Sequence, residues 1–128
     1  MAGKVIDTKT ARTLLGDDGI VRVHMFPGTR ETLETARENI AAYLEICAGK
    51  KLPVLIDLSD TLGASQEARR LYSGDDVSRH AIATAMIVTS PVTKVMASFF
   101  LKLNQPRRIL RLFTSETEAI EWLRQYLP

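Results

Sequence analysis

The residues best placed to bind something lie in one loop. Asp57, Ser59, Asp60 and Ser65 end or follow the apolar run at residues 53–58. In sheets with parallel strands, ligands and switches lie beyond the carboxyl ends of the strands. The loop is therefore predicted to be a switch or a contact for a partner. The same residue types also make ordinary turns, and Ser65 is suited to cap a helix.

The other reactive residues do not indicate catalysis. Nucleophilic catalysis needs a nucleophile with a base in reach, and two histidines with the single Cys47 offer no such spacing. Glycine-rich phosphate loops and Cys/His metal patterns are absent from the sequence. Asp57 invites comparison with a phosphorylatable receiver domain, but the required acidic pair and final lysine are missing. No enzyme activity, cofactor or metal is predicted.

Composition narrows the class of protein further. The chain has 128 residues, enough for one domain with a real core, and we predict a single domain over 1–128. The net charge of +2 is too small to indicate nucleic-acid binding. No stretch is long and apolar enough for a membrane span, and the first ten residues lack a signal peptide's apolar run. With one cysteine, a reducing, cytoplasmic location is expected.

Hydrophobic patterns predict an α/β fold with about five strands and four helices. A hairpin comes first, with strands at residues 5–15 and 20–25 around Gly16–Gly19. One helix is predicted to run to about residue 48 from a cap at Thr29 or Thr32. Further helices are predicted at 65–72, at 90–103 and, from a capping-box pattern that begins at Ser115, through about 126. Buried strands are predicted at 53–58, 81–89 and 109–113, between the helices. The alternation calls for a mixed sheet with parallel crossovers.

The helix predicted at 90–103 is apolar on more than one side. Val92, Val95, Met96 and Phe99 are spaced as a core stripe, and Phe100 and Leu101 extend beyond it. Such an excess indicates either deep burial or an exposed patch for a partner. On the second alternative, the interface comprises Met96, Phe100 and Leu101, and the partner is a second copy or another protein.

Four segments carry a resemblance to a known family. LPVLIDLSD followed by ASQEAR, the block AIATAMIVTSPVTKVMASFFLKLN and the ending RLFTSETEAIEWL resemble the SpoIIAA-like, or STAS-like, family. The most similar members are small stand-alone bacterial proteins of uncharacterised function. The resemblance covers nearly the whole chain. It implies a mixed β-sheet with an N-terminal hairpin and βα crossovers.

The resemblance also implies two kinds of function. Anti-sigma factor antagonists of this superfamily bind a kinase and are switched by phosphorylation of a serine at a helix start. Ser65 is the counterpart by position, but Ala64 and Glu67 depart from the Asp-Ser-x-Gly motif. The predicted function is a non-enzymatic regulatory or protein-interaction module that self-associates. The alternative is a carrier or sensor of a small apolar ligand, because the sheet also resembles that of lipid-carrying domains.

Overall fold

The computed structural model describes residues 4–74, 77, 79–91, 94–95 and 109–127. Its strands and helices, in chain order, are β1 (Val5–Asp7), β2 (Ala11–Leu15), β3 (Val21–Met25), β4 (Arg30–Glu31), α1 (Leu33–Cys47), β5 (Leu52–Asp57), β6 (Gly63–Ala64), α2 (Gln66–Tyr72), β7 (Ala81–Ile87), β8 (Leu110–Phe113) and α5 (Glu116–Arg124). The predicted α/β class is confirmed.

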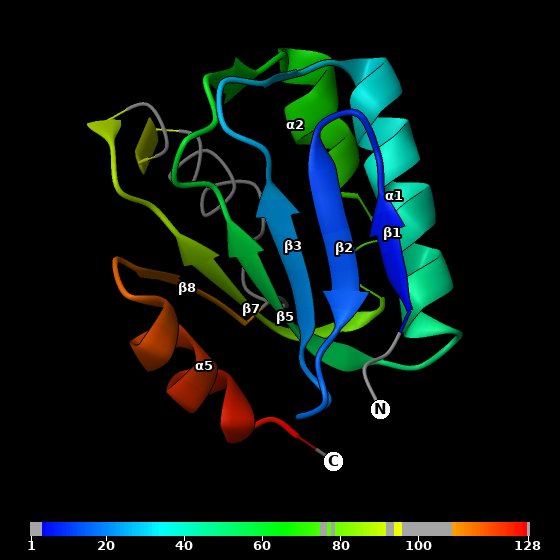
Figure 1. Ribbon diagram of the computed structural model, residues 1–128, viewed down its shortest axis with the longest axis vertical. Coiled ribbons are helices and arrows are strands. Elements are labelled where there is room, and N and C mark those ends of the chain that lie inside the picture. Colours follow the sequence, from blue (N-terminus) through cyan, green and yellow to red (C-terminus); the bar gives the residue numbers. More distant parts are fainter. Residues whose placement is uncertain (1–3, 75–76, 78, 92–93, 96–108, 128) are drawn as a thin grey trace.

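The main sheet has six strands in the order β1-β2-β3-β5-β7-β8. β1, β2 and β3 are antiparallel neighbours, whereas β3, β5, β7 and β8 run parallel. α1 and α2 lie on one face of this sheet and α5 lies on the other (Figure 1). β5 is central in this parallel part, which explains why its residues read as one continuous apolar run.

The sixth strand corrects the sequence prediction. Residues 5–15 were expected to form one strand, but the chain turns back at Thr8–Thr10 and makes β1 and β2 separate strands. The Thr8 N–H donates to the Ala11 carbonyl at 2.9 Å, and the Ala11 N–H donates to the Thr8 hydroxyl at 3.2 Å. Threonine hydroxyls hold this turn without glycine or asparagine. The next hairpin, across Gly16–Gly19, is confirmed.

Capping residues mark the ends of the helices, mostly close to the predicted positions. The Thr32 hydroxyl accepts from the Thr35 N–H, and Ala48 ends α1 in the left-handed conformation. On the apolar side of α1, Leu33 and Leu44 are only partly buried. Three helices are seen in the described part of the chain, where about four were predicted. The remaining predicted helix, at 90–103, falls mostly outside the described residues.

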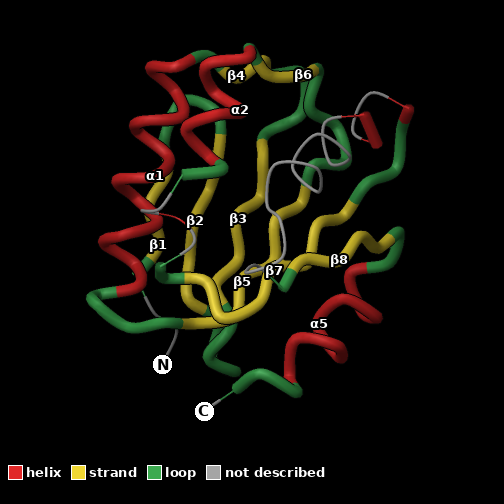
Figure 2. The backbone as a smooth tube through the Cα atoms, turned by 180° about the vertical axis from the view of Figure 1, so that it is seen from behind, coloured by secondary structure: helices red, strands yellow, loops and turns green. Residues whose placement is uncertain are grey.

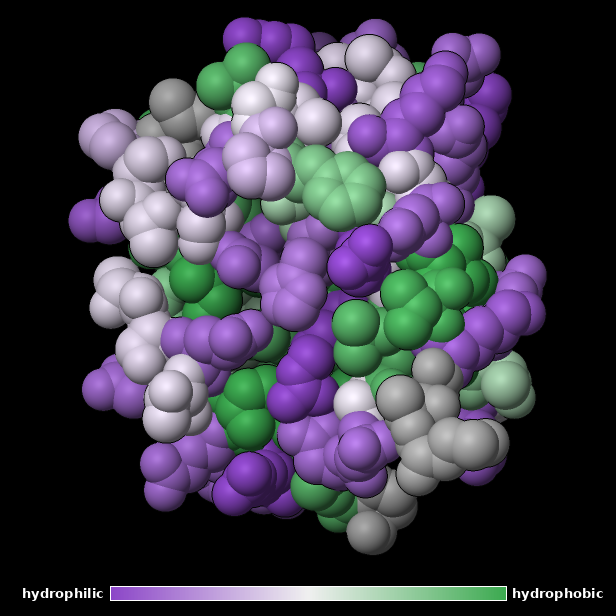
Figure 3. All heavy atoms as spheres, in the orientation of Figure 1, coloured by the Kyte–Doolittle hydropathy of each residue, from purple (hydrophilic) through white to green (hydrophobic). Residues whose placement is uncertain are grey.

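Two apolar clusters fill the two sides of the sheet. Val21, Val23 and Val54 pack with α1, and Ile20 and Leu55 pack with α5. Side chains alternate along a strand, so Arg22 and His24 point to the α5 side. Hydrophilic residues gather over the middle of that face (Figure 3). The predicted strand at residues 20–25 is confirmed, and one of its faces is less buried than the other.

An ion pair in the first long hairpin makes a pH-dependent contribution. Arg22 contacts Asp18 with two nitrogens at 2.8 and 2.9 Å, and this guanidinium lowers the pKa of Asp18. Asp18→Asn is expected to lower the free energy of unfolding at pH 7 by less than about 1 kcal/mol, since the pair is partly exposed. A lowered pKa stabilises the fold above about pH 4, and the difference should vanish as pH falls below that.

Urea unfolding at pH 7 and at pH 2.5 measures this contribution. Asp17→Asn is the matched control, because Asp17 is an exposed carboxyl in the same turn. A deficit of the Asp18 variant that is equal at both pH values would contradict an ionic origin.

None of the helices in the described parts of the chain is long and apolar enough to cross a membrane.

Candidate functional site

The predicted loop is built from ordinary caps and turns. Asp57 ends β5, and its Oδ1 accepts from both the N–H and the hydroxyl of Ser59. Asp60 is exposed, and its carbonyl accepts from the Gly28 N–H. Ser65 caps α2 by accepting from the Ala68 N–H at 3.1 Å, which confirms the capping interpretation. Asp57 and Ser59 are thus hydrogen-bonded to each other, whereas the Ser65 side chain bonds to the backbone of α2.

The predicted interface on the 90–103 helix lies outside the described residues. Met96, Phe100 and Leu101 all belong to that undescribed part. Their neighbour Val95 is described, and its side chain is 68% exposed. The expectation that Val95 belongs to the core is therefore wrong.

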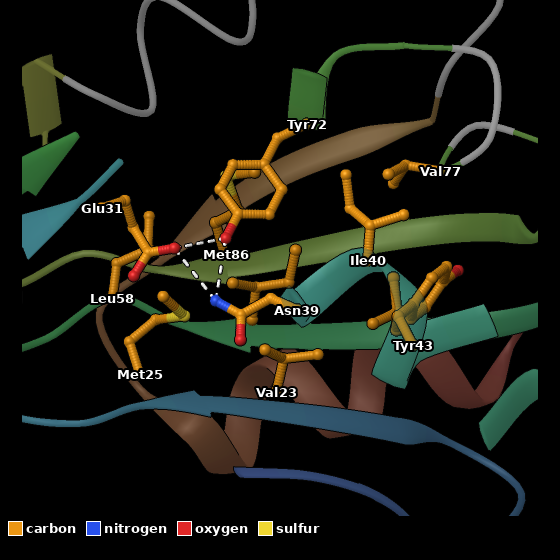
Figure 4. A pocket seen from close by; sticks show the side chains of 12 residues that line it. Val23, Met25, Glu31, Asn39, Ile40, Tyr43, Leu58, Tyr72, Val77 and Met86 are labelled. Atoms are coloured by element: carbon orange, nitrogen blue, oxygen red, sulfur yellow. Dashed lines mark hydrogen bonds between the residues drawn. The ribbon is translucent and has the colours of Figure 1, made fainter. Parts of the chain in front are cut away.

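A cavity of about 70 Å³ lies against the α1–α2 face of the sheet. β3, β5 and β7 contribute strand residues to its wall, and α1 and α2 contribute helix residues (Figure 4). The described residues that line it are Val23, Met25, Glu31, Asn39, Ile40, Tyr43, Val54, Ile56, Leu58, Tyr72, Val77 and Met86. Apart from Glu31 and Asn39, these side chains are apolar or aromatic. Met25, Ile56 and Tyr72 are only partly buried, so part of the wall meets solvent.

Three polar side chains meet at this cavity. The Tyr72 hydroxyl donates to Oε1 of Glu31 at 2.5 Å, and Nδ2 of Asn39 donates to the same oxygen at 2.9 Å (Figure 4). Asn39 Nδ2 also lies 2.9 Å from the Tyr72 hydroxyl and 2.8 Å from Oγ1 of Thr10. The Thr8 hydroxyl donates to Oδ1 of Asn39. Hydrogen bonds thus hold both the oxygen and the nitrogen of the Asn39 amide.

The position of Glu31 is set by the two short strands. β4 and β6 pair in parallel, with Arg30 opposite Gly63 and Glu31 opposite Ala64. The Ser65 N–H donates to the Glu31 carbonyl at 3.0 Å, so the helix-capping serine also anchors this strand. Gly63 has φ +140°, which favours glycine. Figure 2 shows the β4–β6 pair at the end of the sheet near α2.

The two oxygens of Glu31 have different surroundings. The residue is 2% exposed, and Oε1 accepts the bonds from Tyr72 and Asn39. Among the described residues, Oε2 has no hydrogen-bond partner. It points away from Tyr72 and Asn39 (Figure 4) and is itself buried. A buried carboxylate oxygen without a donor is costly.

Two titratable side chains on this side of the sheet have raised pKa values. Burial, with the Glu31 charge nearby, raises the pKa of Tyr72 well above its usual range, so its hydroxyl stays a donor. Burial also raises the pKa of the Cys47 thiol, which disfavours the reactive thiolate. Within the described residues, no group of three His, Cys, Asp or Glu side chains could hold a metal ion.

Sequence reasoning missed this cluster, although one signal was available. Asn39 lies between Ala36 and Ile40 on the apolar stripe of α1 and is 4% exposed. A polar residue inside such a stripe indicates a buried partner. Glu31 and Tyr72 carry no comparable signal, because they are 41 residues apart and only the fold brings them together.

Comparisons with known proteins bear on the fold. A family model described as a domain of unknown function, DUF7793, matches residues 14–127. The chain is also similar to a crystal structure of an uncharacterised protein of the DUF3478 family with a SpoIIAA-like fold, from Shewanella loihica PV-4. Identity is 18%, the TM-score is 0.65, and 96% of this chain and 95% of that chain are covered. No curated protein matches. The predicted SpoIIAA-like fold is confirmed.

Proposed function

The chain belongs to DUF7793, a family of domains of unknown function, and we propose from the geometry of its cavity that it binds a small, mainly apolar molecule as a carrier or sensor. The observation that supports this proposal is the cavity beneath α1 and α2, with its apolar wall and its few polar groups. Ligand sites have this character: hydrophobic lining fixes affinity, and a few placed polar groups fix orientation. The protein acts by binding and not by catalysis.

The size of the cavity supports this proposal. Protein interiors are close-packed and hold few voids larger than a water molecule. A water needs about 10–15 Å³ of such space, and a cavity of about 150 Å³ holds benzene. At about 70 Å³, this cavity lies between the two. It suits a short aliphatic molecule of a few non-hydrogen atoms.

A matched pair of substitutions tests whether the cavity offers free room. Val23 and Val21 are both buried on β3 and face α1, but only Val23 lines the cavity. Val23→Leu is expected to raise the free energy of unfolding by about 0.5–1 kcal/mol, because the added methylene fills free space. Val21→Leu should lower it by about 1–3 kcal/mol through overpacking. Urea unfolding measures both.

Native mass spectrometry of gently purified protein tests the binding itself. The wild type is expected to carry an added mass that is lost on denaturation, and Val23→Leu should carry less of it. A wild type without added mass, together with equal destabilisation by both leucine variants, would overturn the proposal.

A second candidate function is a protein-interaction module, and the exposure of Val95 favours it. An apolar side chain that is 68% exposed, at the position before Met96 in the sequence, fits a contact surface for a second copy or another protein. Regulation through the loop that contains Asp57 and Ser65 would belong to this function. The same native spectrum reports subunit number. A dimer that becomes monomeric on Leu101→Glu would support the candidate, and a wild-type monomer would remove self-association.

A further inference from the structure

The donors at the cavity bond to one another and to their neighbours. The Tyr72 hydroxyl has a single hydrogen, which it donates to Oε1 of Glu31 at 2.5 Å. The amide nitrogen of Asn39 has two hydrogens. Its acceptors, at 2.8–2.9 Å, are Oγ1 of Thr10, Oε1 of Glu31 and the Tyr72 hydroxyl. These acceptors outnumber the hydrogens, so Tyr72 and Asn39 keep no donor for a ligand.

The acceptors are occupied or out of reach as well. Oε1 of Glu31 accepts from Tyr72 and Asn39, and the Thr35 hydroxyl lies 3.2 Å from it. Oε2 is buried and points away from these donors (Figure 4), so a molecule in the cavity does not reach it. The Tyr43 hydroxyl is also fully buried. Aliphatic and methionine side chains make up the rest of the described wall.

We infer that the ligand of the cavity is a wholly apolar molecule, a short hydrocarbon or an apolar gas, with no hydrogen-bonding group of its own. The inference rests on the proposed binding function and narrows its ligand class. A hydroxyl, amine or carboxylate that entered the cavity would lose its hydrogen bonds to water and find no partner, which is costly. An apolar molecule has no such bonds to lose, and apolar cavities stay dry and take up such molecules.

The polar network then holds the shape of the site. It joins Glu31 of β4, Asn39 of α1 and Tyr72 of α2, which wall the cavity opposite the sheet (Figure 4). The volume sets the size of the ligand. A cavity of about 150 Å³ holds benzene, and this cavity, at about 70 Å³, is about half as large. A molecule of about three non-hydrogen atoms is therefore expected.

Propane and ethanol test the inference on the wild-type protein, because they differ only in the exchange of a methyl group for a hydroxyl. Each is titrated at pH 7 as a dissolved probe, and methyl resonances of Val23 and Ile56 report binding by NMR. Propane is expected to bind at least about a hundred-fold tighter than ethanol, whose hydroxyl would stay unpaired. Ethanol that binds within about ten-fold of propane would reveal a polar partner in the cavity and overturn the inference.

Tyr72→Phe opens the network and should weaken the preference for propane. The substitution removes a donor from Oε1 of Glu31 and leaves room where the phenol oxygen lay. Ethanol then has an acceptor, so the preference is expected to fall by at least about ten-fold. Tyr126→Phe removes a phenol oxygen on the α5 side of the sheet and should keep the wild-type preference. An unchanged preference in Tyr72→Phe would contradict exclusion by the network. If this variant does not fold, the two probes on wild-type protein still decide.

The outcomes separate this inference from the proposed function. A protein that carries an added mass in the native spectrum, but binds propane no better than ethanol, keeps the binding function and loses the apolar ligand. The absence of both an added mass and any probe binding overturns the binding function, and the apolar ligand with it.

Discussion

Asn39→Asp is expected to lower the free energy of unfolding at pH 7 by about 3–5 kcal/mol, the cost of an uncompensated buried charge. Nδ2 of Asn39 lies 2.9 Å from Oε1 of Glu31, so the substitution places a second carboxyl against the first. Two carboxyls at that distance must share a proton. In the variant, the Thr10 and Tyr72 hydroxyls also lose the donor that faces them in the wild type, Nδ2 of Asn39.

The deficit should depend on pH in a definite direction. The folded variant must hold a proton that the unfolded chain releases above about pH 4. The native state then binds more protons than the unfolded state, so stability falls as pH rises, by about 1.4 kcal/mol per unit at most. Urea unfolding between pH 4 and pH 7 measures this slope. The variant should be least destabilised at pH 4.

Two controls separate the charge from the lost amide. Asn39→Leu removes the same hydrogen bonds without adding a carboxyl, so its deficit should grow less between pH 4 and pH 7 than that of Asn39→Asp. Ala41→Asp introduces a carboxyl at an exposed position on α1 and should cost less than about 1 kcal/mol. If the deficit of Asn39→Asp grew no more than that of Asn39→Leu, the introduced carboxyl would not lie beside Glu31.

Local signals in the sequence predicted most of the fold. The apolar run at 53–58 marked the central strand, since burial on both faces removes polar alternation. Ser65 and Ser115 were correctly placed as helix caps, because capping depends on a few neighbouring residues. The break between β1 and β2 was missed because Thr8 and Thr10 are weak turn signals. The pair β4–β6 was missed because two residues are too few for a pattern.

The cavity needed three-dimensional information. Its polar groups come from β4, α1 and α2, and only the folded chain, in which the β4–β6 pair positions Glu31, brings their side chains together. Residue types also do not reveal a cavity. Val23 and Val21 are both valines on the same face of β3, but only Val23 lines the cavity. The sequence pointed to the loop with Asp57 and Ser65, where hydroxyls and carboxyls are dense. The structure shows these side chains in caps and turns.

Leu55→Ala is expected to lower the free energy of unfolding by about 3–5 kcal/mol, at the upper end for such substitutions. Leu55 is fully buried on β5, where it packs against α5 through Leu123 and against Ile20. Its other neighbours include Ala83 and Ala85, whose short side chains cannot move in to fill the space. The lost transfer free energy and the cost of the cavity left behind therefore add up.

Leu62→Ala is the matched control for this substitution. Leu62 follows the same strand but is 51% exposed, so its truncation should change the free energy of unfolding by no more than about 0.5 kcal/mol. Urea unfolding at 25 °C compares the two variants with wild type. A loss below about 1 kcal/mol for Leu55→Ala would mean that α5 does not seal this face of the sheet. A large loss would show that the α5 face of β5 is closely packed, in contrast to the α1–α2 face, where the cavity lies and the ligand is proposed to bind.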